Sequence, residues 1–103
     1  MKILCSAIYV DDGRVYEHQP KNIKSGFVVC GRRHHNCIAT LSLIFKDIEL
    51  LIPYKQQGKV VQGFLTDTDI FLDRKESYKV AKTAKQIIHD ELISNTLTSE
   101  DLW

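Results

Sequence analysis

The side chains best suited to chemistry lie together in residues 31–36, which read Gly-Arg-Arg-His-His-Asn. The two arginines carry a permanent positive charge, each histidine donates at least one ring N–H at neutral pH, and the asparagine adds a polar amide. The chain has only four arginines and four histidines, so half of each type falls in this one segment. Such a group of donors is typical of a site that holds an anion.

The elements around this segment decide where its side chains point. Residues 26–30 read as a short strand that Gly31 ends, and apolar residues then recur at helical spacing, at Ile38, Leu41, Ile44 and Phe45. We therefore expect a helix from about residue 34 to residue 45 or slightly beyond, with the basic cluster in its first turn. Unpaired backbone N–H groups and the positive end of the helix dipole would then add to the attraction for an anion.

The rest of the chain predicts a small antiparallel sheet packed with two helices. Residues 3–10 read as a strand, and Asp-Asp-Gly-Arg at 11–14 predicts a hairpin turn into a second strand at 15–17. Residues 59–66 and 70–72 read as two more strands, joined by a polar turn. Asp73 is placed to cap a second helix that runs to about Gln86. The expected fold class is α+β, as one domain over 1–103 with an N-terminal hairpin.

Composition narrows the function classes. The formal net charge of the 103 residues is +1, so the basic cluster is local, and binding to nucleic acid through a broad cationic surface is not favoured. No apolar run approaches the roughly 20 residues of a membrane span, and we expect a cytoplasmic protein. Cys5, Cys30 and Cys37 lack the spacing of a redox or zinc motif, so we expect reduced, buried thiols and no metal.

Four motifs together carry a family resemblance. They are Arg-Arg-His-His at 32–35, Gln-Gly-Phe-Leu-Thr at 62–66, Phe-Leu-Asp-Arg-Lys-Glu at 71–76, and the ending Ser-Glu-Asp-Leu-Trp at 99–103. In these the chain resembles the phage-encoded Thoeris anti-defence proteins. The resemblance implies a small α+β protein of the host cytoplasm that assembles as a homo-oligomer, a dimer or a hexamer. It also implies non-catalytic sequestration, without a cofactor, of cyclic ADP-ribose-type signals made by bacterial TIR-domain enzymes, or of cyclic oligonucleotides, at subunit interfaces.

The chemistry of such a ligand matches the motifs. A pyrophosphate needs cations or amides, ribose hydroxyls need polar side chains, and a base needs an aromatic plane. By the resemblance, Phe64 meets the base, Thr66 a hydroxyl, and Asp73 and Arg74 the ribose and phosphate. The expected ligand-binding residues are Arg32, Arg33, His34, Asn36, Phe64, Thr66, Asp73 and Arg74.

Each of these residues also has a plain structural role open to it. The two neighbouring arginines can belong to a solvated turn, and His34 or Asn36 can serve the start of its own helix. Phe64 can be a core residue, Asp73 only a helix cap, and Arg74 the partner of Glu76 or Glu91.

Other function classes remain open at this stage. The adjacent histidines lack the spacing of phosphoesterase and zinc-protease motifs, and the chain has no nucleophile elbow or phosphate loop, so no enzyme is expected. A weak nucleotide hydrolase would nonetheless use nearly the same residues. The runner-up is a phage module that binds nucleic acid or a host protein, although we expect no sequence-specific nucleic-acid contact and no membrane contact.

Overall fold

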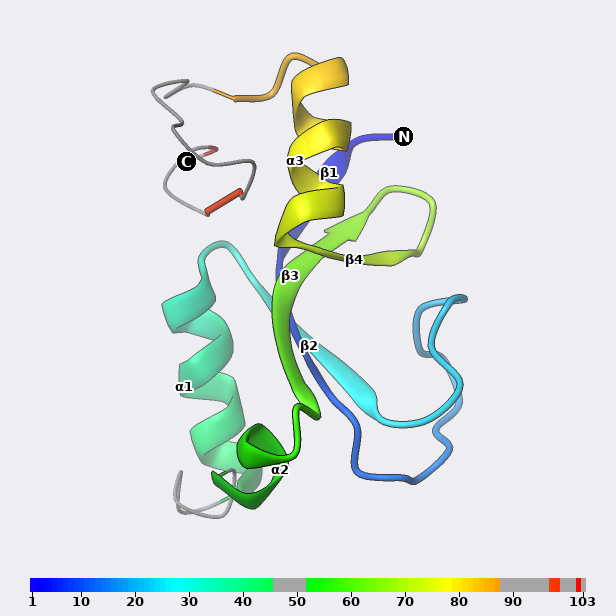
Figure 1. Cartoon of the computed structure of the whole chain (residues 1–103), viewed down its shortest axis with the longest axis vertical. Coiled ribbons are helices and arrows are strands. Elements are labelled where there is room, and N and C mark those ends of the chain that lie inside the picture. The colour runs from blue at the N-terminus through cyan, green and yellow to red at the C-terminus, as the bar shows by residue number, and fades with distance from the viewer. Residues whose placement is uncertain (46–51, 88–96, 99–101, 103) are drawn as a thin grey trace.

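The fold is built on a four-stranded sheet in which the first strand of the chain, β1 (Ile3–Val10), is a central strand. The computed structural model describes residues 1–45, 52–87, 97–98 and 102. The sheet is antiparallel throughout, in the order β2-β1-β3-β4, with three helices packed beside it (Figure 1). The strands are β1 (Ile3–Val10), β2 (Phe27–Gly31), β3 (Val60–Thr66) and β4 (Phe71–Asp73), and the helices are α1 (His34–Phe45), α2 (Ile52–Gln56) and α3 (Arg74–Thr83). The predicted α+β class, with a small antiparallel sheet and an N-terminal strand pair, is confirmed.

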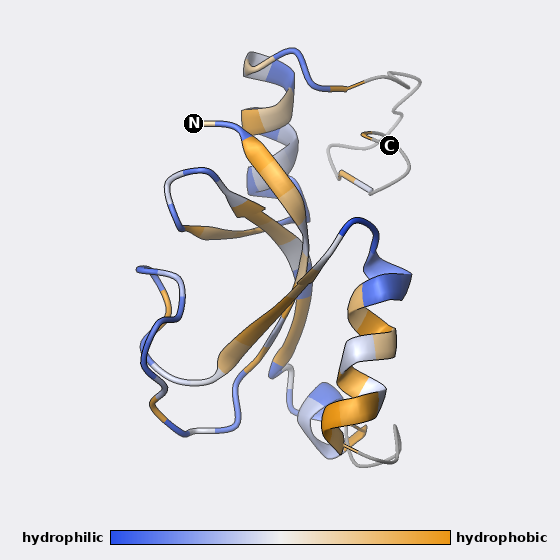
Figure 2. Ribbon diagram, turned by 180° about the vertical axis from the view of Figure 1, so that it is seen from behind, coloured by the Kyte–Doolittle hydropathy of each residue, from blue (hydrophilic) through white to orange (hydrophobic). Residues whose placement is uncertain are grey.

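The two longer helices cover the same face of the sheet. Strand side chains alternate between faces, and the core side chains of β1 and β3 that meet the helices lie on one side. Beside α1 the buried core consists of Ile8, Val10, Val29, Cys37 and Leu41. Beside α3 it consists of Ile3, Phe64, Ala81, Leu97 and Leu102. The first turn of α1 is hydrophilic and its later turns are apolar, as Figure 2 shows by colour.

The second strand of the N-terminal pair is not where the turn signal placed it. β1 pairs with β2 in a register that sets Ser6 opposite Gly31, whereas residues 15–17 form no strand. Asp11 and Asp12 use their side chains to accept from the backbone N–H groups two residues on, which closes local turns instead of a hairpin. Val15 is 82% exposed, so the predicted strand would have had no apolar face to bury.

The other predicted elements follow the sequence pattern closely, except at the end of α3, while the short helix α2 was not among the two helices predicted. The predicted strand before Gly31 and the helix from His34 to Phe45 are confirmed. α3 ends at Thr83 rather than near Gln86, because Lys85 adopts a left-handed φ of 56°. Gln86 then turns its amide to the backbone of Ile3, accepting from its N–H at 2.7 Å and donating to its carbonyl at 2.8 Å.

The C-terminal residues that the structure describes pack on the core. Leu97 is fully buried and Leu102 is 7% exposed, both against Phe64 and Ala81. Trp103, the last residue of the C-terminal motif, lies outside the described residues. No helix in the described part of the chain is long and apolar enough to cross a bilayer.

Candidate functional site

The start of α1 is fixed by a reciprocal pair of hydrogen bonds. The backbone N–H of Asn36 donates to the carbonyl of Arg33 at 3.0 Å, and the backbone N–H of Arg33 donates to Asn36 Oδ1 at 3.1 Å. This is one half of a capping box: the amide of Asn36 accepts from the N-cap backbone N–H, as Glu or Gln usually does, but the N–H of Asn36 is received by the backbone carbonyl of Arg33 and not by a capping side chain. Asn36 therefore serves the start of its own helix, the structural role that its position had left open. The same bonds set the direction in which Arg32 and Arg33 leave the sheet.

His34 ties α1 to the middle of β3. Its side chain is buried, its Nε2 lies 2.8 Å from the carbonyl oxygen of Gly63, and its ring meets Phe64 edge-on at 5.1 Å between centroids. Since the carbonyl can only accept, Nε2 carries the proton of this bond. His35, one residue on, is exposed. The structure therefore gives His34 a positioning role beneath the two arginines.

The start of α3 carries the second cation. Asp73 has extended backbone angles and its Oδ1 accepts from the backbone N–H of Glu76 at 2.8 Å, so it is the N-cap that the sequence suggested. Arg74, the first helical residue, donates from Nη2 to Oε1 of Gln62 on β3 at 2.5 Å. Its Nε is buried and has no hydrogen-bond partner among the described residues. A buried donor without a partner is costly, so a water molecule or an anion that accepted from this Nε would stabilise the arrangement.

The two helix starts converge on adjacent residues of β3. His34 holds the carbonyl of Gly63 and Arg74 holds the side chain of Gln62, so the Arg32–Arg33 turn and Arg74 approach the same stretch of strand. A side chain at Gly63 would collide with the carbonyl oxygen of Leu72, which explains the glycine in this motif. Within the described residues, no ion pair joins Arg32 or Arg74 to a carboxylate.

Phe64 and Thr66, by contrast, lie inside the protein. Phe64 is 0% exposed in the core beside α3 and offers no ring face to a ligand in a single chain. Thr66 is 1% exposed, and its Oγ1 accepts from the backbone N–H groups of Thr68 and Ile70, both at 3.3 Å. It closes the turn between β3 and β4. The structure thus brings together the cationic part of the predicted site and leaves the predicted aromatic and hydroxyl contacts in the core.

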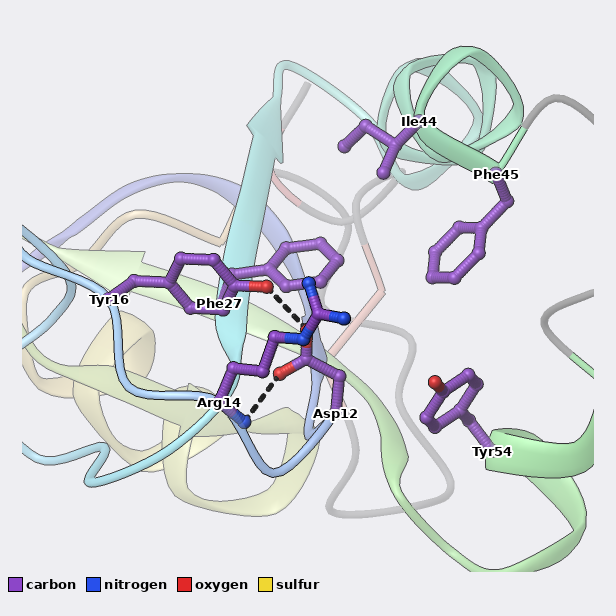
Figure 3. A pocket seen from close by; sticks show the side chains of 7 residues that line it. All are labelled: Asp12, Arg14, Tyr16, Phe27, Ile44, Phe45 and Tyr54. Carbon is purple, nitrogen blue, oxygen red and sulfur yellow. Dashed lines mark hydrogen bonds between the residues drawn. The ribbon is translucent and has the colours of Figure 1, made fainter.

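A separate aromatic cavity lies at the far end of α1 (Figure 3). It encloses about 240 Å³ and is lined by Asp12, Arg14, Tyr16, Phe27, Ile44, Phe45 and Tyr54. Neighbouring rings contact in sequence, with centroids 5.8 Å apart for Tyr16 and Phe27, 6.4 Å for Phe27 and Phe45, and 6.1 Å for Phe45 and Tyr54. The hydroxyl of Tyr16 donates to Asp12 at 2.5 Å, which raises the pKa of Tyr16.

This cavity is too far from the arginines to share a small ligand with them. α1 has 12 residues, and at about 1.5 Å per residue its two ends are roughly 16 Å apart. The sequence had left Tyr16 and Tyr54 without a role, and it had missed Gln62, whose amide holds Arg74. A polar residue at a strand position that faces the helices was the available signal for Gln62. No group of three or more His, Cys, Asp or Glu side chains suited to a metal occurs in the described segments.

Comparison with known proteins gives one family. The family model described as phage T4 y16D protein matches residues 2–103, which is nearly the whole chain. No curated protein and no solved structure matches. A match of this length makes the chain a member of the phage T4 y16D family.

Proposed function

We propose that this phage protein is a non-catalytic sponge that binds and sequesters a cyclic ADP-ribose-type nucleotide signal in the host cytoplasm. The observation that carries the proposal is the convergence of the two cationic helix starts on Gln62 and Gly63, where Arg74 keeps a buried donor that has no partner among the described residues. The arginines at both helix starts, and the strand residues that they approach, belong to motifs that resemble the Thoeris anti-defence proteins. Phage origin agrees with the family.

The cations suit a pyrophosphate. Arg74 presents a guanidinium whose Nη2 is held by Gln62 and whose Nε awaits an acceptor, so a phosphate oxygen would satisfy it. Arg32 is exposed on the turn above His34, and Arg33 follows it. Two or three cations over a short distance match the two charges of a pyrophosphate better than they match an extended polymer, for which the net charge of +1 is too small.

The base needs an aromatic surface that the described residues of one chain do not offer at this place. Because Phe64 is buried, an aromatic face for an adenine would come from a second copy, which supports sites at the interfaces of a homo-oligomer, a dimer or a hexamer. A cyclic oligonucleotide carries the same phosphate and base groups and is the alternative ligand. A nucleotide hydrolase is less well supported, since His34 is engaged by the Gly63 carbonyl rather than presented to a substrate.

Retention followed by analysis of the ligand tests this function. The protein is incubated with cyclic ADP-ribose isomers or cyclic trinucleotides, separated by ultrafiltration and denatured, and the released nucleotide is identified by mass spectrometry. We expect intact nucleotide at a fixed ratio to protein; a cleaved product would make the protein an enzyme. Arg33→Ala and Arg74→Met should lose retention while remaining folded, whereas the matched control Arg14→Ala, at the other end of α1, should retain it. Retention by both site variants would place the site elsewhere.

A host-protein-binding module is the second candidate, and a specific surface favours it. Two side chains of the cavity wall, Tyr16 and Ile44, are 39% and 51% exposed. Their sequence neighbours Val15 and Leu43 are 82% and 81% exposed. Exposed apolar surface at a cavity is typical of interaction sites in soluble domains. If this surface carries the function, Leu43→Glu should abolish capture of a host protein, and Arg74→Met should leave that capture unchanged.

A further inference from the structure

Two cysteines lie close together on neighbouring strands, on the face of the sheet opposite α1 and α3. Cys30 on β2 pairs with Ala7 on β1, and Cys5 lies two residues before Ala7. Because side chains two residues apart on a strand point the same way, Cys5 and Cys30 are diagonal neighbours on one face. The expectation of buried thiols is wrong for this pair: Cys30 is exposed and Cys5 is only partly buried, so a small molecule in solution can reach both.

The two thiols differ in acidity because they contact each other. A hydrogen bond from the thiol of Cys5 lowers the pKa of Cys30 to about 7. The same bond, together with burial, raises the pKa of Cys5, which therefore stays protonated. At neutral pH about half of Cys30 is then the thiolate, the nucleophilic form of cysteine, beside a protonated Cys5.

The third cysteine is the opposite case. Cys37 on α1 is 0% exposed on the helix-covered face, and its thiol donates to the carbonyls of Ser6 and Arg33, each at 3.6 Å. Burial raises the pKa of Cys37 to about 11. A buried, protonated thiol is inert toward oxidants in water. The chain thus contains its own comparison for the reactivity of the other two.

We propose that Cys5 and Cys30 form a site of reversible thiol oxidation, at which a peroxide converts the two thiols into a disulfide that links β1 to β2. The Cys30 thiolate attacks one peroxide oxygen, the O–O bond breaks, and Cys30 becomes a sulfenic acid as hydroxide leaves. The Cys5 sulfur then attacks the Cys30 sulfur, the S–O bond breaks, and the proton of Cys5 leaves with the hydroxyl as water. The two sulfurs together lose two electrons, and the peroxide gains them.

The geometry makes this disulfide possible but easily reduced. Diagonal neighbours have Cα atoms about 7–8 Å apart, at or just beyond the upper limit that a disulfide spans, so closure requires a small backbone shift. The register irregularity between Ile3 and Cys5, where β1 leaves its regular pairing with β3, allows that shift. Strained disulfides have more oxidising potentials and are readily reversed by cellular thiols, which suits a site that responds to conditions.

The position of the pair connects it to the turn that carries the arginines. Ser6, next to Cys5, donates from Oγ to the carbonyl of Arg32 at 3.0 Å, and Arg32 follows Cys30 by two residues. A link between Cys5 and Cys30 would therefore fasten β1 to β2 directly below the Arg32–Arg33 turn. The proposal itself does not depend on what that turn binds.

Peroxide treatment with mapping of each cysteine tests the proposal. The full chain is treated with hydrogen peroxide, alkylated before and after reduction with dithiothreitol, and analysed by peptide mass spectrometry. We expect one intramolecular Cys5–Cys30 disulfide that dithiothreitol reverses, with Cys37 unmodified. Cys37→Ser should oxidise as the parent does, and Cys30→Ser should react at least about tenfold more slowly. Cys5→Ser should stop at the sulfenic or sulfinic acid of Cys30. A disulfide to Cys37, a disulfide between two chains as the main product, or equal reaction of Cys30→Ser would overturn the proposal.

Discussion

Arg74 holds a charge in a partly buried position where its Nε has no partner in the part of the chain that the structure describes, an arrangement that costs stability. We predict that Arg74→Met, which keeps the length of the side chain and removes its polar groups, changes the free energy of unfolding by no more than about 1 kcal/mol in either direction. Loss of the bond to Gln62 opposes the relief of the unpaired donor. Urea denaturation measures the change, with the exposed neighbour in Lys75→Met as the control.

The size of that change separates two roles for the residue. A loss of several kcal/mol would mean that Arg74 is there to hold α3 on β3, because breaking a needed buried contact has such a cost. A small change together with lost nucleotide retention would mean that the guanidinium is kept for a ligand.

The reactivity of the Cys30 thiol should depend on pH. Since its pKa is lowered to about 7, the rate of alkylation by iodoacetamide should rise through neutral pH and reach half its maximum near pH 7. In Cys5→Ala the donor that lowers this pKa is gone, so the midpoint should move upward toward the ordinary value of 9.0. Mass spectrometry of the Cys30 peptide over a range of about two pH units either side of neutrality measures both midpoints. Equal midpoints in the two proteins would contradict the contact.

At the scale of elements, the N-cap of α3 is the best-defined local device. Replacing Asp73 by Ala removes the acceptor for the N–H of Glu76 and should lower the free energy of unfolding by about 1 kcal/mol. Asp73→Asn keeps a side-chain oxygen at the same place and should cost much less. Thermal or urea denaturation of the two variants measures the difference. Similar losses in both would mean that the charge on Asp73, and not the cap, matters to the fold.

Some elements were predictable because a local signal is enough to define them. The helix from His34 to Phe45 was predicted from apolar residues at helical spacing, and its bounds are confirmed. Its buried face is not the predicted stripe, since Ile38 and Ile44 are 44% and 51% exposed. The buried residues are His34, Cys37 and Leu41. The absence of a hairpin at 11–17 could not be predicted. The side chains of Asp11 and Asp12 close local turns there, and the strand that pairs with β1 begins only after Gly26. The early end of α3 depends on Gln86 reaching Ile3, a contact 83 residues apart that no local pattern contains.

The candidate site divides in the same way. The positions of Arg32, Arg33 and Arg74 at two helix starts followed from strand ends and cap signals, which are local. The burial of Phe64 depends on α3 and on Leu97 and Leu102 packing over β3, and these are contacts between distant parts of the chain. An aromatic residue on a strand has the same pattern whether its face is covered or open.

At the scale of the whole molecule, the chain presents two unlike surfaces at the two ends of α1. One end carries the arginine turn and the other carries the aromatic cavity with its exposed apolar rim. Because sites more than about 10 Å apart are usually independent in energy, changes at one end should not alter the other. Leu43→Glu should therefore leave the affinity for nucleotide at the arginine turn unchanged. The exception would be an oligomer in which the apolar rim forms the contact between the copies that build the nucleotide site.

This last condition leads to a prediction about assembly. A single chain offers cations at the convergence of α1 and α3 but keeps Phe64 covered, so we expect a second copy to complete the site for the base. Nucleotide bound per chain should then fall when the protein is diluted below the dissociation constant of its dimer, and nucleotide should in turn favour the assembled form, since linkage is reciprocal. Native mass spectrometry over a dilution series, with and without nucleotide, measures both quantities. Full retention of nucleotide by a monomer would show that one chain suffices, and the face for the base would then have to be sought within it.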